Sequence, residues 1–134
     1  MTETNNVFSA ENANEGILHI LFYLSVLISK RTPQFFGIDN IETALNPHLC
    51  RHLMKGMSEL AIQNDKQIVV TTHNPAILDG LDLTNDDIRL FEVYRGDNGD
   101  TRTRRIQVRP GAEKKHKLSE MWMRGVLGAI SKNF

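Results

Sequence analysis

Two copies of one pattern constrain the fold more than any other feature: a short apolar segment, a polar residue at its end, and then Asn-Pro. The copies are QFFGI at 34–38 with Asp39 and Asn46-Pro47, and KQIVVTT at 66–72 with His73 and Asn74-Pro75. Short, continuously apolar segments are typical of strands covered on both faces. Asparagine is a good helix N-cap and proline suits the first helical position, so each pair starts a helix, the first running to about residue 64 and the second short. Strand, helix, strand, helix in this order predicts a parallel sheet with right-handed crossovers.

The flanking segments complete a predicted α/β fold. Residues 14–30 are apolar nearly all round, which predicts a helix buried on most sides. Two strand-like segments, 88–95 and 101–108, surround an Asn-Gly turn and predict an antiparallel hairpin whose two turn residues have positive φ. A final helix is expected from residue 117 to about residue 132.

Length, cysteine content and hydropathy indicate a single-domain protein of a reducing compartment. The 134 residues are a one-domain length, and the single Cys50 excludes an internal disulfide framework. The polar start lacks the basic and apolar regions of a signal peptide. The apolar run at 17–28 is shorter than the roughly 20 residues that a membrane span needs. We therefore expect a cytoplasmic protein with no membrane segment.

Charge is unevenly distributed, although the net charge is zero. Residues 1–100 hold seven Lys and Arg against 14 Asp and Glu, whereas residues 101–134 hold nine against two. Arg102 and Arg104 share one face of an expected strand and could contact DNA phosphates. No aromatic residues alternate with the arginines, so reading of bases is not expected. The alternative is that the basic segment docks on the acidic remainder of the chain.

Asp39 and His73 are the candidate functional residues. The carboxyl ends of parallel strands share one edge of a sheet, where α/β proteins bind ligands, so the two side chains are expected side by side. An aspartate there can hold Mg²⁺ opposite nucleotide phosphates, and a histidine can donate to a γ-phosphate or to the attacking water. The alternatives are an aspartate that caps its loop and a histidine that satisfies loop carbonyls. His48 and His52 are spaced i, i+4 on a helix, but we expect a solvated face there and not a zinc site.

The order of motifs resembles the C-terminal lobe of ABC-type ATPases, in the RecF/SMC/OLD-like branch of the AAA-family proteins. The matching motifs are a signature-like Asn14-Glu15-Gly16 before an apolar helix, a Walker B strand at 35–39, a D-loop at 43–47 and a switch region at 71–75. The resemblance covers residues 12–130 and implies part of a three-layer, P-loop-NTPase-like parallel sheet with a C-terminal antiparallel β-hairpin and a final helix. It also implies ATP and Mg²⁺ as cofactors. The implied site residues are Asp39 for the metal, Asn40, Glu42 and His73 for catalysis, and Asn14, Gly16 and Asn46 for the nucleotide.

Three departures from the family pattern bear on the activity. Asn40 stands where the family has a glutamate that polarises the attacking water, and an amide cannot accept a proton. Either Glu42 or a partner supplies the base, or hydrolysis is slow, which is what we expect. Asn14 replaces the signature serine, and its alternative role is a plain helix cap. No segment matches G-x-x-x-x-G-K-[ST], so the phosphate cradle is expected from a P-loop-containing N-terminal half or a second ATPase chain.

The resemblance implies an ATP-gated switch in DNA repair or anti-phage defence. Residues 1–134 are then the C-terminal part of an ABC-type ATPase domain without its P-loop lobe, homodimeric in its full-length form, with DNA or a nuclease effector as further partners. One alternative is a non-catalytic protein- or DNA-binding module derived from such an ATPase. Another is a nuclease that uses Asp39 and Glu42 as metal ligands, but two close carboxylates alone make a poor two-metal site.

Overall fold

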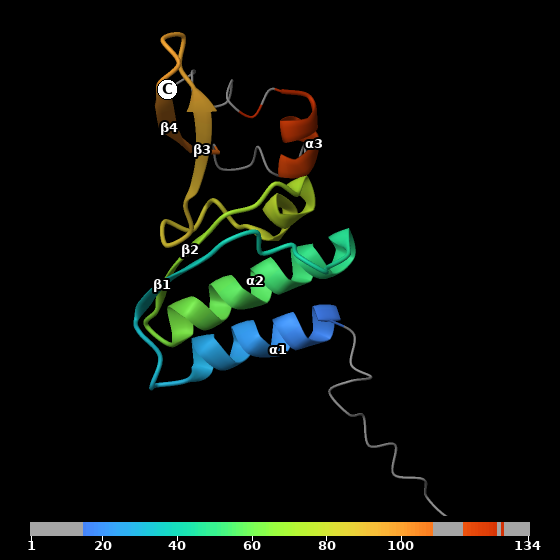
Figure 1. Ribbon diagram of the computed structural model, residues 1–134, viewed down its shortest axis with the longest axis vertical. Helices are drawn as coiled ribbons and strands as arrows, with labels where there is room; N and C mark the ends of the chain where they lie inside the picture. The colour runs from blue at the N-terminus through green and yellow to red at the C-terminus, as the bar shows by residue number, and fades with distance from the viewer. Residues whose placement is uncertain (1–14, 109–116, 126, 128–134) are drawn as a thin grey trace, which may run out of the picture.

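The computed structural model describes residues 15–108, 117–125 and 127 of the chain (Figure 1). The elements in chain order are α1 (Glu15–Ile28), β1 (Phe35–Ile38), α2 (Pro47–Gln63), β2 (Gln67–Val70), the 3₁₀ helix η2 (Pro75–Gly80), β3 (Leu90–Arg95), β4 (Thr101–Ile106) and α3 (Leu118–Met123). They form two parts: a parallel pair of strands with α1 and α2, and an antiparallel hairpin with α3.

The first part is the strand–helix–strand unit that the sequence predicts. β1 and β2 pair in parallel, with Phe35 opposite Gln67 and Ile38 opposite Val70, and α2 connects them. Every second strand residue packs against the helices, while Phe35 and Val69 on the other face are 60% and 52% exposed. The strands are therefore covered on one face only within the described residues, and the expectation of cover on both faces is wrong for this part of the chain.

α2 has the capping geometry that its sequence predicts. The Asn46 side chain accepts a hydrogen bond from the Leu49 backbone N–H at 2.9 Å, and Pro47 opens the helix. The Asn74 side chain likewise accepts a hydrogen bond from the Ala76 backbone N–H at 3.0 Å, but the short helix that Pro75 opens is a 3₁₀ helix. The two Asn-Pro pairs thus start the next helix after each strand, following the loop 39–45 after β1 and residues 71–73 after β2.

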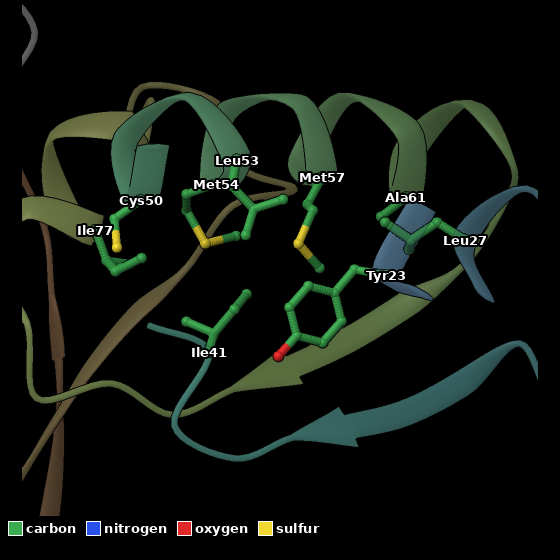
Figure 2. Packing of buried hydrophobic residues seen from close by; sticks show 9 residues of the cluster. All are labelled: Tyr23, Leu27, Ile41, Cys50, Leu53, Met54, Met57, Ala61 and Ile77. Atoms are coloured by element: carbon green, nitrogen blue, oxygen red, sulfur yellow. The ribbon is translucent and has the colours of Figure 1, made fainter. Parts of the chain in front are cut away.

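The main core lies between α2, α1 and the loop that follows β1 (Figure 2). Met57 and Leu27 are fully buried, and so is Ile41 of the loop. The Tyr23 ring lies between α2 and the strands, with its hydroxyl directed toward the strands. This core holds the loop after β1, which carries the candidate site, against the helices.

α1 is less buried than the sequence predicts. Only Gly16, Tyr23 and Leu27 are buried along it. Five apolar residues on the remaining surface are between 40% and 62% exposed: Ile17, Leu18, Leu21, Phe22 and Ile28. The apolar composition predicted the helix correctly, but one side of it has no cover among the described residues.

The hairpin and α3 form a second core with η2. Ile77 belongs to the first core and the adjacent Leu78 to the second, so η2 connects the two. The Asp79 carboxylate accepts hydrogen bonds from the backbone N–H and the hydroxyl of Ser119, at 3.0 and 2.7 Å. These bonds fix the start of α3 on η2.

Two details of this second part differ from the prediction. Gly99 has φ of 79°, but Asn98 does not have positive φ, because the connection is a longer turn closed by bonds from the Gly96 and Gly99 backbone N–H groups. α3 ends at Met123, well before residue 132, and Gly125 follows with φ of 67°. Residue 126 and residues 128–134 lie outside the described part of the chain.

None of the helices in the described ranges has the length and hydropathy of a bilayer-crossing segment.

Candidate functional site

Asp39 and His73, the polar residues that the sequence singles out, follow the ends of the paired strands β1 and β2. The pairing continues one step past the strands, because the Thr71 N–H donates to the Ile38 carbonyl at 3.0 Å and the Ile41 N–H donates to the Thr71 carbonyl at 3.2 Å. Asp39 therefore stands beside Thr71. The Thr71 hydroxyl donates to Asp39 Oδ1. Both side chains are exposed.

Glu42 connects the loop after β1 to the segment that follows β2. Its Oε1 accepts a hydrogen bond from the His73 backbone N–H at 2.9 Å, whereas the His73 side chain is exposed. Glu42 Oε2 is buried and has no hydrogen-bond partner among the described residues. The structure thus brings Asp39, Asn40, Glu42 and His73 to one edge of the sheet, and the strand order predicts this for Asp39 and His73.

The pKa of Glu42 reflects opposing influences. Burial raises it, but the backbone hydrogen bond from His73, the nearby Thr72 side chain and the charge of His73 together hold this pKa below its usual range. The same carboxylate adds to the effect of burial in raising the pKa of the Tyr23 phenol and of the Cys50 thiol. A carboxylate with a lowered pKa is a weaker proton acceptor than an ordinary glutamate.

The loop between β1 and α2 contains two residues with unusual backbone angles. Asn40 has φ of 49° and Ala44 has φ of 62°. Asparagine tolerates this left-handed region, whereas alanine disfavours it. The loop is held by the Thr43 backbone N–H and hydroxyl, which donate to the Asn40 carbonyl at 3.0 and 2.8 Å, and by Ile41 in the core. These contacts hold the backbone at Asn40.

Two of the predicted nucleotide-binding residues, Gly16 and Asn46, lie at the starts of α1 and α2. Gly16 is buried in the first turn of α1, and Asn14 lies outside the described residues. The oxygen of the Asn46 side chain caps α2. His19 Nδ1 of α1 is 3.1 Å from the carbonyl oxygen of Thr43, so α1 contacts the same loop as the candidate site.

The donor set at Asp39 fits Mg²⁺ in one particular way. Within residues 15–108, 117–125 and 127, no three His, Cys, Asp or Glu residues gather into a metal-binding group. Asp39 offers a single exposed carboxylate, with Oδ1 bonded to Thr71 and Oδ2 3.5 Å from the Asn40 amide nitrogen. Mg²⁺ is commonly bound by one or two carboxylates together with water and substrate phosphates, so this site fits a metal that arrives with a nucleotide.

Other candidates from the sequence have structural explanations. His48 and His52 are exposed on α2 with ring centroids 4.6 Å apart, as a solvated face would be. The arginines of β4 are each paired with an acid: Arg102 with Asp100, Arg104 with Glu92 and Arg105 with Asp86, at 2.7, 2.5 and 3.7 Å. The basic strand is thus largely neutralised by the hairpin and the segment before it.

Thr71 and His19 are contacts of the site that sequence reasoning missed. Thr71 lies near the end of the predicted strand 66–72, and the available signal was its place at the same sheet edge as Asp39. Nothing in the sequence pairs His19 with Thr43, which lies 24 positions away.

Glu42→Gln should lower stability in a pH-dependent way. Because the folded protein lowers the pKa of Glu42, the ionised carboxylate stabilises the fold above the ordinary glutamate pKa, and this contribution is lost as the pH falls through the lowered value. We expect the wild-type protein to be more stable than Glu42→Gln near neutral pH, and the difference to shrink at about pH 3. Urea unfolding at both pH values measures the difference in the free energy of unfolding between the two proteins. Glu59→Gln, on the exposed side of α2, is the charge-matched control. A difference that is independent of pH would contradict this role of the charge.

The family comparison matches the part of the chain that contains this site. The family model described as "AAA domain, putative AbiEii toxin, Type IV TA system" matches residues 3–79, more than half of the chain. The match ends in η2, ahead of the hairpin and α3. No curated protein and no solved structure matches the chain. The chain therefore belongs to this AAA-domain ATPase family, which links it to nucleotide binding and to toxin–antitoxin defence.

Proposed function

We propose that this chain contributes the Walker B and switch residues to a composite ATP site and acts as an ATP-gated switch in DNA repair or anti-phage defence. The observation that carries the proposal is the pair of strand ends. Asp39 and His73 follow neighbouring parallel strands, and Thr71 and Glu42 tie the two ends together with hydrogen bonds. This edge of a parallel sheet is where α/β proteins bind ligands.

Each residue has a role that follows from its position. Asp39 holds Mg²⁺, which neutralises developing charge on the phosphates when it is bound. The exposed imidazole of His73 donates a hydrogen bond to the γ-phosphate or to the attacking water. Gly16, and Asn14 ahead of it, contact the nucleotide at the start of α1, and Asn46 holds the adjacent start of α2.

The other part of the nucleotide site comes from a P-loop-bearing half or from a second ATPase chain. The printed sequence contains no P-loop motif, so the backbone cradle and the lysine for the phosphates need another source. The uncovered sheet face supports this proposal, because strands of parallel sheets are normally buried on both faces. A separate apolar cleft of about 320 Å³ lies on the helix-covered side of the strands, between α1 and β1, and is lined by Phe22 and Phe36 among others. In its full-length form we propose a homodimer, closed by ATP.

Hydrolysis in the completed site is slow. Asn40 stands beside Asp39 and cannot accept a proton from water. Glu42, the nearest alternative base, accepts the His73 N–H and has a lowered pKa. Both observations favour a site that stays closed while ATP is bound and turns over rarely.

Asp39→Ala should remove most of the Mg²⁺-dependent ATP binding. The experiment supplies the chain with a P-loop-bearing half and measures the Kd for ATP with Mg²⁺ and with EDTA, together with the oligomeric state. Loss of an ionic metal ligand should weaken Mg²⁺-ATP binding by at least about tenfold and leave the EDTA value unchanged. Asp97→Ala, in the exposed turn of the hairpin, is the matched loss of one negative charge. If Asp39→Ala leaves both Mg²⁺-ATP affinity and dimerisation unchanged, the proposed function is wrong.

A further inference from the structure

The arrangement around Asp39 contains a residue to which no role in the site has been assigned. Thr71 makes four hydrogen bonds to the segment that leaves β1, two from its backbone and two from its hydroxyl. The backbone bonds to Ile38 and Ile41 extend the parallel pairing beyond the strands and fix the position of the Thr71 Cα. The side chain therefore starts from a rigid point directly beside Asp39.

The direction of the hydroxyl hydrogen is determined by its neighbours. The Asn40 backbone N–H is 3.0 Å from Thr71 Oγ1 and can only donate, so the hydroxyl oxygen accepts there. A threonine hydroxyl has a single hydrogen, which is left for the carboxylate oxygen Oδ1 of Asp39. The branched side chain of threonine also restricts rotation about χ1, so this arrangement needs little further ordering.

These bonds leave one side of the Asp39 carboxylate available. Oδ1 is engaged by Thr71, while among the described residues Oδ2 has only the Asn40 amide nitrogen at 3.5 Å, a long and weak contact. Both Asp39 and Thr71 are exposed on the side of the sheet where Phe35 and Val69 have no cover. The carboxylate is thus held with one weakly engaged oxygen, Oδ2, at the exposed strand ends.

We propose that Thr71 is a positioning residue that orients the Asp39 carboxylate for a divalent metal through its hydroxyl, while Asp39 Oδ2 contacts the metal or its water. The inference rests on the proposed function, because it needs Asp39 to be the metal ligand. Groups that hydrogen-bond to metal-ligating carboxylates fix the ligand geometry, and their loss commonly lowers metal affinity by about 10- to 100-fold. Thr71 does not itself contact the nucleotide.

The test compares Thr71→Val, which keeps the branched shape but removes the hydroxyl, with Thr71→Ser, which keeps the hydroxyl. The chain is supplied with a P-loop-bearing half and ATP, and free Mn²⁺ is counted by electron paramagnetic resonance. We expect Thr71→Val to raise the Kd for Mn²⁺ by about 10- to 100-fold and Thr71→Ser to stay within a few-fold of wild type. The Kd for ATP measured in EDTA should not change, whereas a general loss of structure would raise it. Thr103→Val, on the exposed face of the hairpin, should bind Mn²⁺ as wild type does.

A second readout uses the chain alone and no metal. Thr71→Val removes the acceptor of the Asn40 N–H, so amide hydrogen exchange at Asn40 should become faster, while Thr71→Ser should retain its protection. Wild-type Mn²⁺ affinity in Thr71→Val overturns the inference, provided that Asp39→Asn lowers that affinity. Wild-type affinity in Asp39→Asn means that the metal site itself, and with it the proposed function, is wrong. Equal loss of affinity in Thr71→Val and Thr71→Ser also overturns the role of the hydroxyl.

Discussion

Asn40→Glu should increase the rate of ATP hydrolysis by about two orders of magnitude or more, once the chain is supplied with a P-loop-bearing half. The Asn40 backbone is held on both sides, by Thr71 at its N–H and by Thr43 at its carbonyl. The Cα of a glutamate at this position should therefore lie where the Cα of Asn40 lies. The Asn40 amide nitrogen is 3.5 Å from Asp39 Oδ2. It places a proton acceptor beside the proposed metal ligand, where the wild-type protein has only an amide.

This gain should come with a cost in stability. Asn40 has φ of 49°, a conformation that asparagine adopts readily and that other side chains avoid by about 1–2 kcal/mol. Asn40→Gln carries the same backbone cost and similar length without a carboxylate, so it is the matched control. Steady-state turnover at saturating ATP measures the effect. Equal turnover in Asn40→Glu and Asn40→Gln would mean that Asn40 is not what limits hydrolysis, and that Glu42 or a partner supplies the base.

The local pattern predicted the elements of the site but not the contacts between them. Asn46-Pro47 and Asn74-Pro75 predict helix starts because capping is a short-range effect, and both helices begin there. The parallel pairing that brings Asp39 next to Thr71 follows from the strand–helix–strand order. The hydrogen bond from Thr71 to Asp39 depends on the exact register, and the one between Glu42 and the His73 N–H depends on how the loop turns.

The loop conformation itself has no signal in the sequence. Ala44 has φ of 62°, although alanine disfavours that region, so local propensity alone predicts a different path. The surrounding contacts decide it: Ile41 is buried in the core, and the Thr43 carbonyl meets His19 of α1. Burial of α1 was mispredicted for a related reason. An apolar helix surface predicts burial, but it does not identify the segment that covers it.

Gly80→Ala should destabilise the fold, because an added methyl group meets the backbone of α2. A Cβ at residue 80 would overlap the backbone carbonyl oxygen of Arg51 in α2 and come within 3.1 Å of Met54 Cβ. Backbone atoms inside a helix cannot move aside as a flexible side chain can, so η2 would have to separate from α2. Overpacking of this kind costs typically 1–3 kcal/mol, which corresponds to a fall in Tm of about 4–12 °C for a chain of this size.

Gly56→Ala is the control that reverses the sign. Gly56 lies within α2, and a Cβ there meets no atom within 4 Å beyond the helix's own backbone, so alanine should stabilise the helix by about 1 kcal/mol. Thermal unfolding of the two variants distinguishes a packing effect from a general intolerance of substitution. Because Ile77 and Leu78 of η2 belong to different cores, Gly80→Ala should loosen the hairpin and α3 together with the contact to α2. Equal Tm values for Gly80→Ala and Gly56→Ala would contradict the close approach of η2 to α2, and with it the connection between the strand-end site and the hairpin.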